Sequence, residues 1–115
     1  MPSPRKYRTA LVTALLDLLD FVDEKLQEAL DDPASQLAAA TEAGCAMPLM
    51  LERLREDEVI GANFVLVLGT KLERQHWQEW WHDFARMERE EFGREAADVI
   101  DRVSVLREVL ATKPD

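Results

Sequence analysis

Two histidines and their acidic neighbours are the residues of this chain whose types and spacing best suit metal chemistry. Glu73 and His76 form one Glu-x-x-His unit, and Glu79 and His82 form a second. On a helix this spacing places a carboxylate and an imidazole on one face, as in di-iron bundles. The two histidines are six residues apart, about 120° out of alignment on a helix, so they cannot share one ion. A site on Glu73 and His76 would therefore need carboxylates from a second chain.

Other arrangements that could do chemistry are missing from the sequence. It contains no glycine-rich phosphate loop, no nucleophile elbow and no Cys-x-x-Cys pair. The single cysteine, Cys45, has no basic neighbour to favour its thiolate, so we expect a small buried residue. It can form no internal disulfide, which favours a reducing cytoplasmic location. We expect a protein that is not an enzyme and carries no cofactor.

An aromatic stripe is the most distinctive binding candidate. This tryptophan stripe comprises Trp77, Trp80, Trp81 and Phe84, at the spacing i, i+3, i+4, i+7 of one helix face. Such a stripe commonly belongs to a core. Tryptophan is nevertheless rarely buried completely, and it is enriched at the energetic centres of protein interfaces. We therefore expect part of the stripe to be covered by a second copy of the chain, as a homodimer, or by a partner protein.

A row of like charges is the second binding candidate. This acidic row comprises Asp17, Asp20, Glu24, Glu28 and Asp31, at spacings of three and four residues. Like charges one helical turn apart repel, so the row costs helix stability. It is either a solvated face or a phosphate-like surface that occupies the basic groove of a nucleic-acid-handling partner. The second interpretation would make the protein an inhibitor or an immunity-type protein.

Four helical segments are expected to position these residues. Their predicted bounds are about 9–30, 35–57, 63–92 and 94–110. Pro48 lies inside the second segment, where proline removes a backbone donor, so that helix should be kinked or split. The fold class is therefore all-α, either a four-helix bundle or an irregular helical cluster.

Capping residues and glycines suggest where these helices begin and end. Ser35 can cap the second helix and Asn63 the third, while Gly93 is placed to stop the third. The apolar stretch from Val59 to Gly69 could be a strand. We expect a helix there, because a strand needs a partner and no second candidate exists.

Length and composition are those of one folded, acidic domain. The 115 residues are 47% hydrophobic and 32% charged, with a net charge of −9, so the chain can bury a core. Residues 1–8 should form a flexible basic tip, and residues 9–112 a single helical domain. The acidic body disfavours direct binding of nucleic acid, and no apolar run is long enough to span a membrane.

The sequence therefore predicts a small acidic helical protein-interaction module, an adaptor or inhibitor that associates with itself or with a partner protein. The first alternative is an inhibitor or immunity-type protein that occupies the basic groove of a nucleic-acid-handling partner. The second is a dimeric di-iron or other metal-binding bundle.

Overall fold

A computed structural model of the chain describes residues 4–112, with the side chains of residues 9–111. Regular structure in this part of the chain is entirely helical, which confirms the all-α class. The α-helices are α1 (Pro4–Asp31), α2 (Gln36–Gly44), α3 (Ala46–Leu54), α4 (Glu58–Leu68), α5 (Trp77–Ala85) and α6 (Arg89–Thr112). Two short 3-10 helices are η1 (Pro33–Ser35) and η2 (Gly69–Lys71). The ambiguous apolar stretch is helical, as expected.

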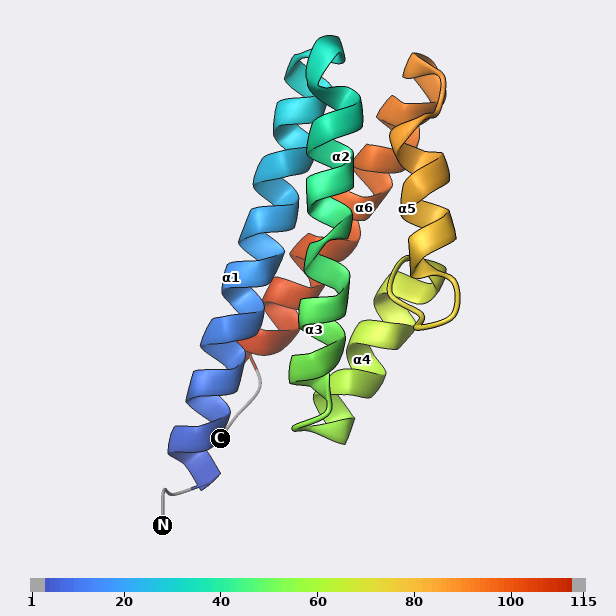
Figure 1. The fold of residues 1–115 in the computed structure, drawn as a ribbon. Coiled ribbons are helices and arrows are strands. Elements are labelled where there is room, and N and C mark those ends of the chain that lie inside the picture. The colour runs from blue at the N-terminus through green and yellow to red at the C-terminus, as the bar shows by residue number, and fades with distance from the viewer. Residues whose placement is uncertain (1–3, 113–115) are drawn as a thin grey trace.

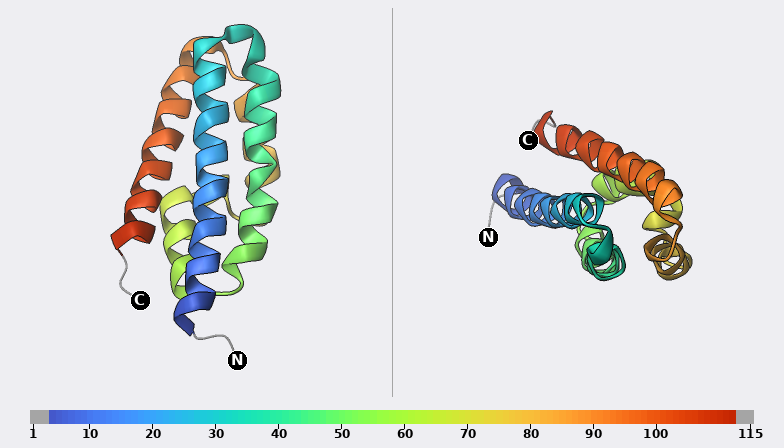
Figure 2. Two further views of the ribbon diagram at one scale, coloured as in Figure 1. Left: turned by 90° about the vertical axis from the view of Figure 1, so that its left-hand side faces the viewer. Right: turned by 90° about the horizontal axis from the view of Figure 1, so that it is seen from above.

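The helices form four antiparallel columns, as Figure 1 and Figure 2 show. The first column is α1, the second is α2 with α3, the third is α4 with α5, and the fourth is α6. The long α1 packs against α2, α3 and α6, while α5 packs against α2 and α4 packs against α6. The predicted helical bundle is confirmed, with its second and third columns broken part-way.

Pro48 breaks the second column one turn before its own position. A proline ring clashes with the carbonyl of the residue four positions earlier and offers that carbonyl no amide. For Pro48 that residue is Gly44, the last residue of α2, and Cys45 separates it from α3. The predicted split of this helix is confirmed, although its second piece ends at Leu54 rather than near Asp57.

The third column begins earlier than expected because Asp57 caps it. The Asp57 carboxylate accepts hydrogen bonds from the amides of Val59 and Ile60 at 3.0 and 3.1 Å. These bonds satisfy two free donors of a helix start. The predicted cap at Asn63 is wrong, since Asn63 lies inside α4.

The prediction of one continuous helix over 63–92 is wrong. α4 ends at Leu68, and Gly69 has a φ of 56° and a ψ of −133°, a backbone conformation that glycine adopts without strain and that residues with a Cβ rarely adopt. The chain resumes a helix only at Trp77. Apolar residues recur on both sides of Gly69, so periodicity alone did not separate the two helices.

The fourth column also starts earlier than expected. α5 ends at Ala85, and α6 begins at Arg89. The Glu88 carboxylate accepts from the amide of Glu90 at 2.8 Å and so caps α6. The predicted stop at Gly93 is wrong, because Gly93 lies inside α6, where a Cβ would meet nothing within 4 Å.

The predicted tip, residues 1–8, lies outside the described side chains, although the backbone from Pro4 onward belongs to α1. Within the described residues, no helix has an apolar stretch long enough to cross a bilayer. The core is lined by the inward faces of all four columns. From α1 it includes Leu15, Leu19 and Leu26, which are fully buried.

Candidate interaction surfaces

The tryptophan stripe packs mostly inside the bundle. Trp81 and Phe84 are buried on α5, while Trp77 and Trp80 are half-buried. The Trp80 and Phe84 rings stack with centroids 4.8 Å apart, and Phe84 stacks on Phe92 of α6 at 4.6 Å. These contacts join α5 to α6. Only parts of Trp77 and Trp80 remain accessible to a partner.

Trp81 also holds the segment between α4 and α5. Its indole Nε1 donates to the backbone oxygen of Lys71 at 2.7 Å. The Lys71 ammonium lies 4.6 Å from the centroid of the Trp80 ring and 4.0 Å from Oδ2 of Asp98. Burial, and then the nearby charge of Arg102, lower the pKa of Lys71. Sequence reasoning missed Lys71, because no local pattern signals that its side chain is buried.

The acidic row lies on the outer surface of α1, and all five carboxylates are exposed. Two of them have basic partners. Asp20 pairs with Arg107 of α6 at 2.7 Å, and Glu28 pairs with Lys25 at 3.3 Å. Such exposed pairs contribute little stability, but they neutralise part of the row. The members that form no ion pair with a described basic side chain are Asp17, Glu24 and Asp31.

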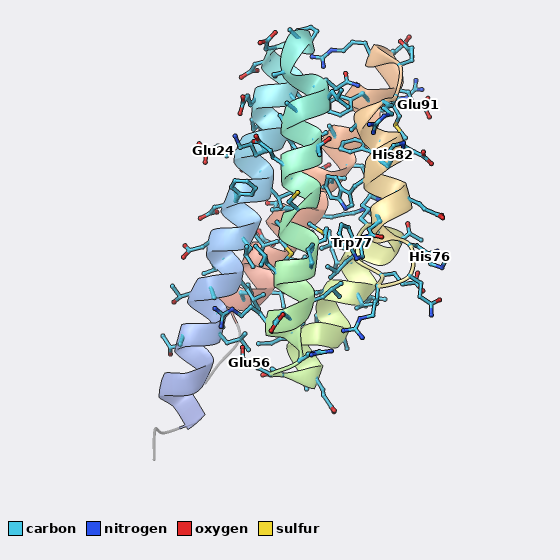
Figure 3. All side chains as sticks on the ribbon, viewed as in Figure 1. Glu24, Glu56, His76, Trp77, His82 and Glu91 are labelled. Carbon is cyan, nitrogen blue, oxygen red and sulfur yellow. The ribbon has the colours of Figure 1, made fainter. Side chains whose placement is uncertain are left out.

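The predicted metal ligands Glu73 and His76 do not share a helix. They lie in the turn before α5, where the His76 amide donates to the Glu73 carbonyl at 2.9 Å. Figure 3 shows His76 on the outside of this turn, away from Trp77. In the part of the chain that the structure describes, no group of three or more His, Cys, Asp or Glu side chains could hold a metal ion. A site completed by a second chain stays a prediction.

A groove of about 480 Å³ lies between α1 and α3; we call it the α1/α3 groove. Its lining residues are Ala14, Asp17, Leu18, Leu49, Glu52 and Arg53. Leu49 is 57% exposed. Asp17 belongs to α1 and Glu52 to α3. Farther along the same two columns, Lys25 of α1 and Glu42 of α2 form a 2.8 Å ion pair.

A second depression lies between α2–α3 and α5; we call it the α5 cleft. It consists of two neighbouring hollows of about 260 and 190 Å³ that share Trp77. The larger is lined by Thr41, Gly44, Cys45, Trp77, Gln78, Trp81, His82 and Arg86. The smaller is lined by Pro48, Leu51, Glu52, Arg55, Arg74 and Trp77. Figure 3 shows Trp77 in the space between α3 and α5.

Cys45 opens onto the α5 cleft, so the prediction that it is buried is wrong. Consecutive helical positions differ by about 100° in direction, and only some of them can face a core. The residues on either side of Cys45, Gly44 and Ala46, are buried, as are Ala43 and Met47. The thiol therefore points outward from between two inward residues.

α4 carries a third surface that sequence reasoning did not find. Leu66 is 80% exposed, Val59 60% and Val65 46%, and Ala62 is exposed beside them. Their spacing places them on one side of α4. In the sequence, apolar residues occur on both faces of this helix, so the pattern did not indicate which face meets the core.

No family model matches this chain, and no curated protein or solved structure is detectably similar to it.

Proposed function

We propose that this chain is a protein-interaction module that binds a basic amphipathic helix of a partner protein in the α1/α3 groove. The observation that carries the proposal is a groove whose lining combines apolar residues with an excess of acid. The apolar lining residues are Ala14, Leu18 and Leu49, which we call the apolar floor, and the charged ones are Asp17, Glu52 and Arg53. A helix with an apolar stripe and basic flanks matches both features.

The dimensions of the groove suit a short helix. α3 has nine residues, so it is about 13 Å long and can lie beside roughly two to three turns of a partner helix. The apolar strip extends beyond the hollow to Phe21, which is 38% exposed on the next turn of α1. Leucine side chains at i, i+3 and i+7 of a partner would meet this strip.

The charge of the chain favours a basic partner. Residues 17–58 carry twelve acidic and three basic residues. Of the basic ones, Lys25 pairs with Glu28 and Glu42, and Arg53 lies 3.8 Å from Glu56. The surface around the groove is therefore negative, which speeds encounter with basic segments and makes binding sensitive to salt.

The inhibitor interpretation is a special case of this proposal. Basic helices are also the elements with which many proteins contact nucleic-acid phosphates. The carboxylates of Asp17, Glu24 and Asp31, which form no ion pair with a described basic side chain, support that interpretation, whereas the pairing of Asp20 and Glu28 reduces the charge available for it. Competition between this chain and DNA for the basic partner would distinguish an inhibitor from an adaptor.

The groove is tested with a fluorescent synthetic peptide that forms a leucine-striped, lysine-rich helix, with a glutamate-rich version as the control. Binding is followed by fluorescence anisotropy at low and high ionic strength. Leu49→Glu should weaken binding at least tenfold, because it places a charge on the apolar floor. Leu66→Glu on α4 is the matched control and should change nothing. Both leucines are exposed, so neither change should unfold the bundle.

A second pair of variants separates the groove from general acidity. Asp17→Lys and Asp31→Lys change the net charge equally, but only Asp17 lines the groove. We expect a larger loss of affinity from Asp17→Lys. Equal losses from both variants, or no loss from Leu49→Glu, would contradict the proposal.

Self-association stays a prediction, and the exposed apolar surface that could support it is smaller than the sequence suggested. The tryptophan stripe was its basis, and Trp81 and Phe84 are now in the core. Light scattering over a concentration series tests it directly. If a dimer forms, Trp77→Ala should weaken it while leaving the helical content unchanged, provided that the exposed part of the stripe is the interface.

A further inference from the structure

The α5 cleft is positively charged in a chain whose net charge is −9. Arg86 lines its larger hollow, and Arg55 and Arg74 line its smaller one. The single acidic residue among the lining residues is Glu52.

The acids of α5 do not offset this charge. Glu79 and Asp83 lie roughly 160° around the helix axis from Trp81, which lines the cleft. Neither residue is among those that line the cleft.

The arginines of the smaller hollow lack acidic partners. Among the described residues, neither Arg55 nor Arg74 has a carboxylate oxygen within 4 Å, although both are exposed on an acidic protein. Arg86 lines the larger hollow, and its Nη1 donates a hydrogen bond to the His82 carbonyl at 3.0 Å. A guanidinium presents a planar set of donors that matches a carboxylate or a phosphate. The two guanidinium groups in the smaller hollow could therefore bind the anionic group of a ligand.

Indole rings line the larger hollow. Gly44 lets the backbone of α2 approach α5 so closely that a Cβ would lie 3.0 Å from Cβ and Cγ of Trp81. Trp77 is half-buried at the junction of the two hollows. Trp77 is also outside the ring contacts that pack Trp80, Trp81 and Phe84 together. Its indole is therefore available to stack on a flat ligand.

We propose that the α5 cleft binds a small planar aromatic anion. The ring lies in the larger hollow against Trp77, and the anionic group reaches the smaller hollow, where Arg74 and Arg55 bind it. At about 260 Å³ the larger hollow accommodates one or two fused rings but not a larger ligand. The ligand that fits is a flat ring that carries a carboxylate or a phosphate. Two kinds of molecule have these features, an aromatic carboxylate and a nucleoside monophosphate.

The test is titration of the whole, 15N-labelled protein, followed by the NMR signals of its indole N–H groups, which the unlabelled probes do not obscure. The probes are indole-3-acetate and adenosine monophosphate. Indole and adenosine are the neutral controls, and inorganic phosphate is the control without a ring. We expect the Trp77 signal to shift with at least one charged probe, and its neutral counterpart to bind about tenfold more weakly. The probe that binds more tightly shows which of the two kinds of ligand, aromatic carboxylate or nucleoside monophosphate, fits the cleft better.

Substitutions in and outside the α5 cleft test whether the probes bind there. Arg74→Gln should weaken binding of the charged probe about tenfold, because it removes a charge-assisted hydrogen bond. Arg94→Gln is the matched control: Arg94 lies on α6 with its side chain 72% exposed and should have no effect. Cys45→Phe should block the ring, whereas Cys45→Ser should not, and both replace an exposed side chain.

The proposal is overturned if neither charged probe shifts the indole signals. It is also overturned if neutral and charged probes bind equally, or if Arg74→Gln and Arg94→Gln behave alike. The groove and the cleft share Glu52, but Asp17 and Leu49 line only the groove and Arg74 lines only the cleft, so these variants test the two proposals separately.

Discussion

Substituting alanine at Gly44 tests the closest approach between the second and third columns. The new Cβ would lie 3.0 Å from Cβ and Cγ of Trp81 and 3.2 Å from Cδ2, whereas carbon atoms in contact prefer about 3.5–4.0 Å. The two closest atoms are at the root of the Trp81 side chain, so rotating the indole does not remove the overlap. α2 and α5 would have to move apart.

The size of the effect follows from two opposing contributions. Overpacking of this kind costs about 1–3 kcal/mol, and replacing glycine by alanine in a helix returns about 1 kcal/mol. We therefore expect Gly44→Ala to lower the free energy of unfolding by on the order of 1 kcal/mol. Gly93→Ala supplies the reference, because a Cβ at Gly93 meets nothing within 4 Å. That variant should raise the free energy of unfolding by about 0.5–1 kcal/mol.

Urea denaturation followed by circular dichroism measures both variants under the same conditions. Subtracting the two results gives an upper limit to the overpacking cost, because Gly44 is the last residue of α2 and gains less helix propensity than Gly93 inside α6. If Gly44→Ala stabilised the protein as much as Gly93→Ala, α2 could not approach Trp81 as closely as described. The account of the α5 cleft wall would then be wrong as well.

Three further changes test how the break between α4 and α5 is held. Trp81→Phe should lower the free energy of unfolding by about 1–3 kcal/mol, because it leaves the Lys71 carbonyl without its indole donor; the half-buried Trp77→Phe should cost clearly less in the same urea titration. Gly69→Ala should cost about 1–3 kcal/mol, since Gly69 has a φ of 56° and a ψ of −133°, and an unchanged midpoint would refute this backbone conformation. The third is Lys71→Met: because the pKa of Lys71 is lowered in the folded state, the unfolded chain binds more protons. The free energy of unfolding of the natural protein, minus that of Lys71→Met, should thus rise with pH between that lowered pKa and the usual 10.5. If this difference did not change across that pH range, the burial of a charged Lys71 would be contradicted.

The helices themselves were largely predictable from local residues. Composition and periodicity indicated an all-α chain, and Pro48 located the break in the second column to within one turn, because proline acts on the carbonyl four residues earlier. The break in the third column was missed. Gly69 ends α4 through its backbone conformation, and a pattern of apolar residues contains no information on φ.

The surfaces were less predictable than the helices, since exposure depends on which columns meet. Periodicity identified the tryptophan stripe, but it could not show that α2 and α6 would cover Trp81 and Phe84. The acidic row lies on the outer face of α1, as its spacing predicts. Arg107, which pairs with Asp20, lies on α6 and reaches the row only through the fold.

The sequence alone was sufficient for the helical class, the acidic character and the one-sided patterns, because these depend on residue type and on spacings within a single helix. The two candidate sites required the tertiary structure. Asp17 and Leu49 share a groove, and Arg55, Arg74 and Trp77 share a cleft, because separate columns bring them together. Spacing along one helix reports which side chains share a face, but only the packing of helices against one another decides which faces become neighbours.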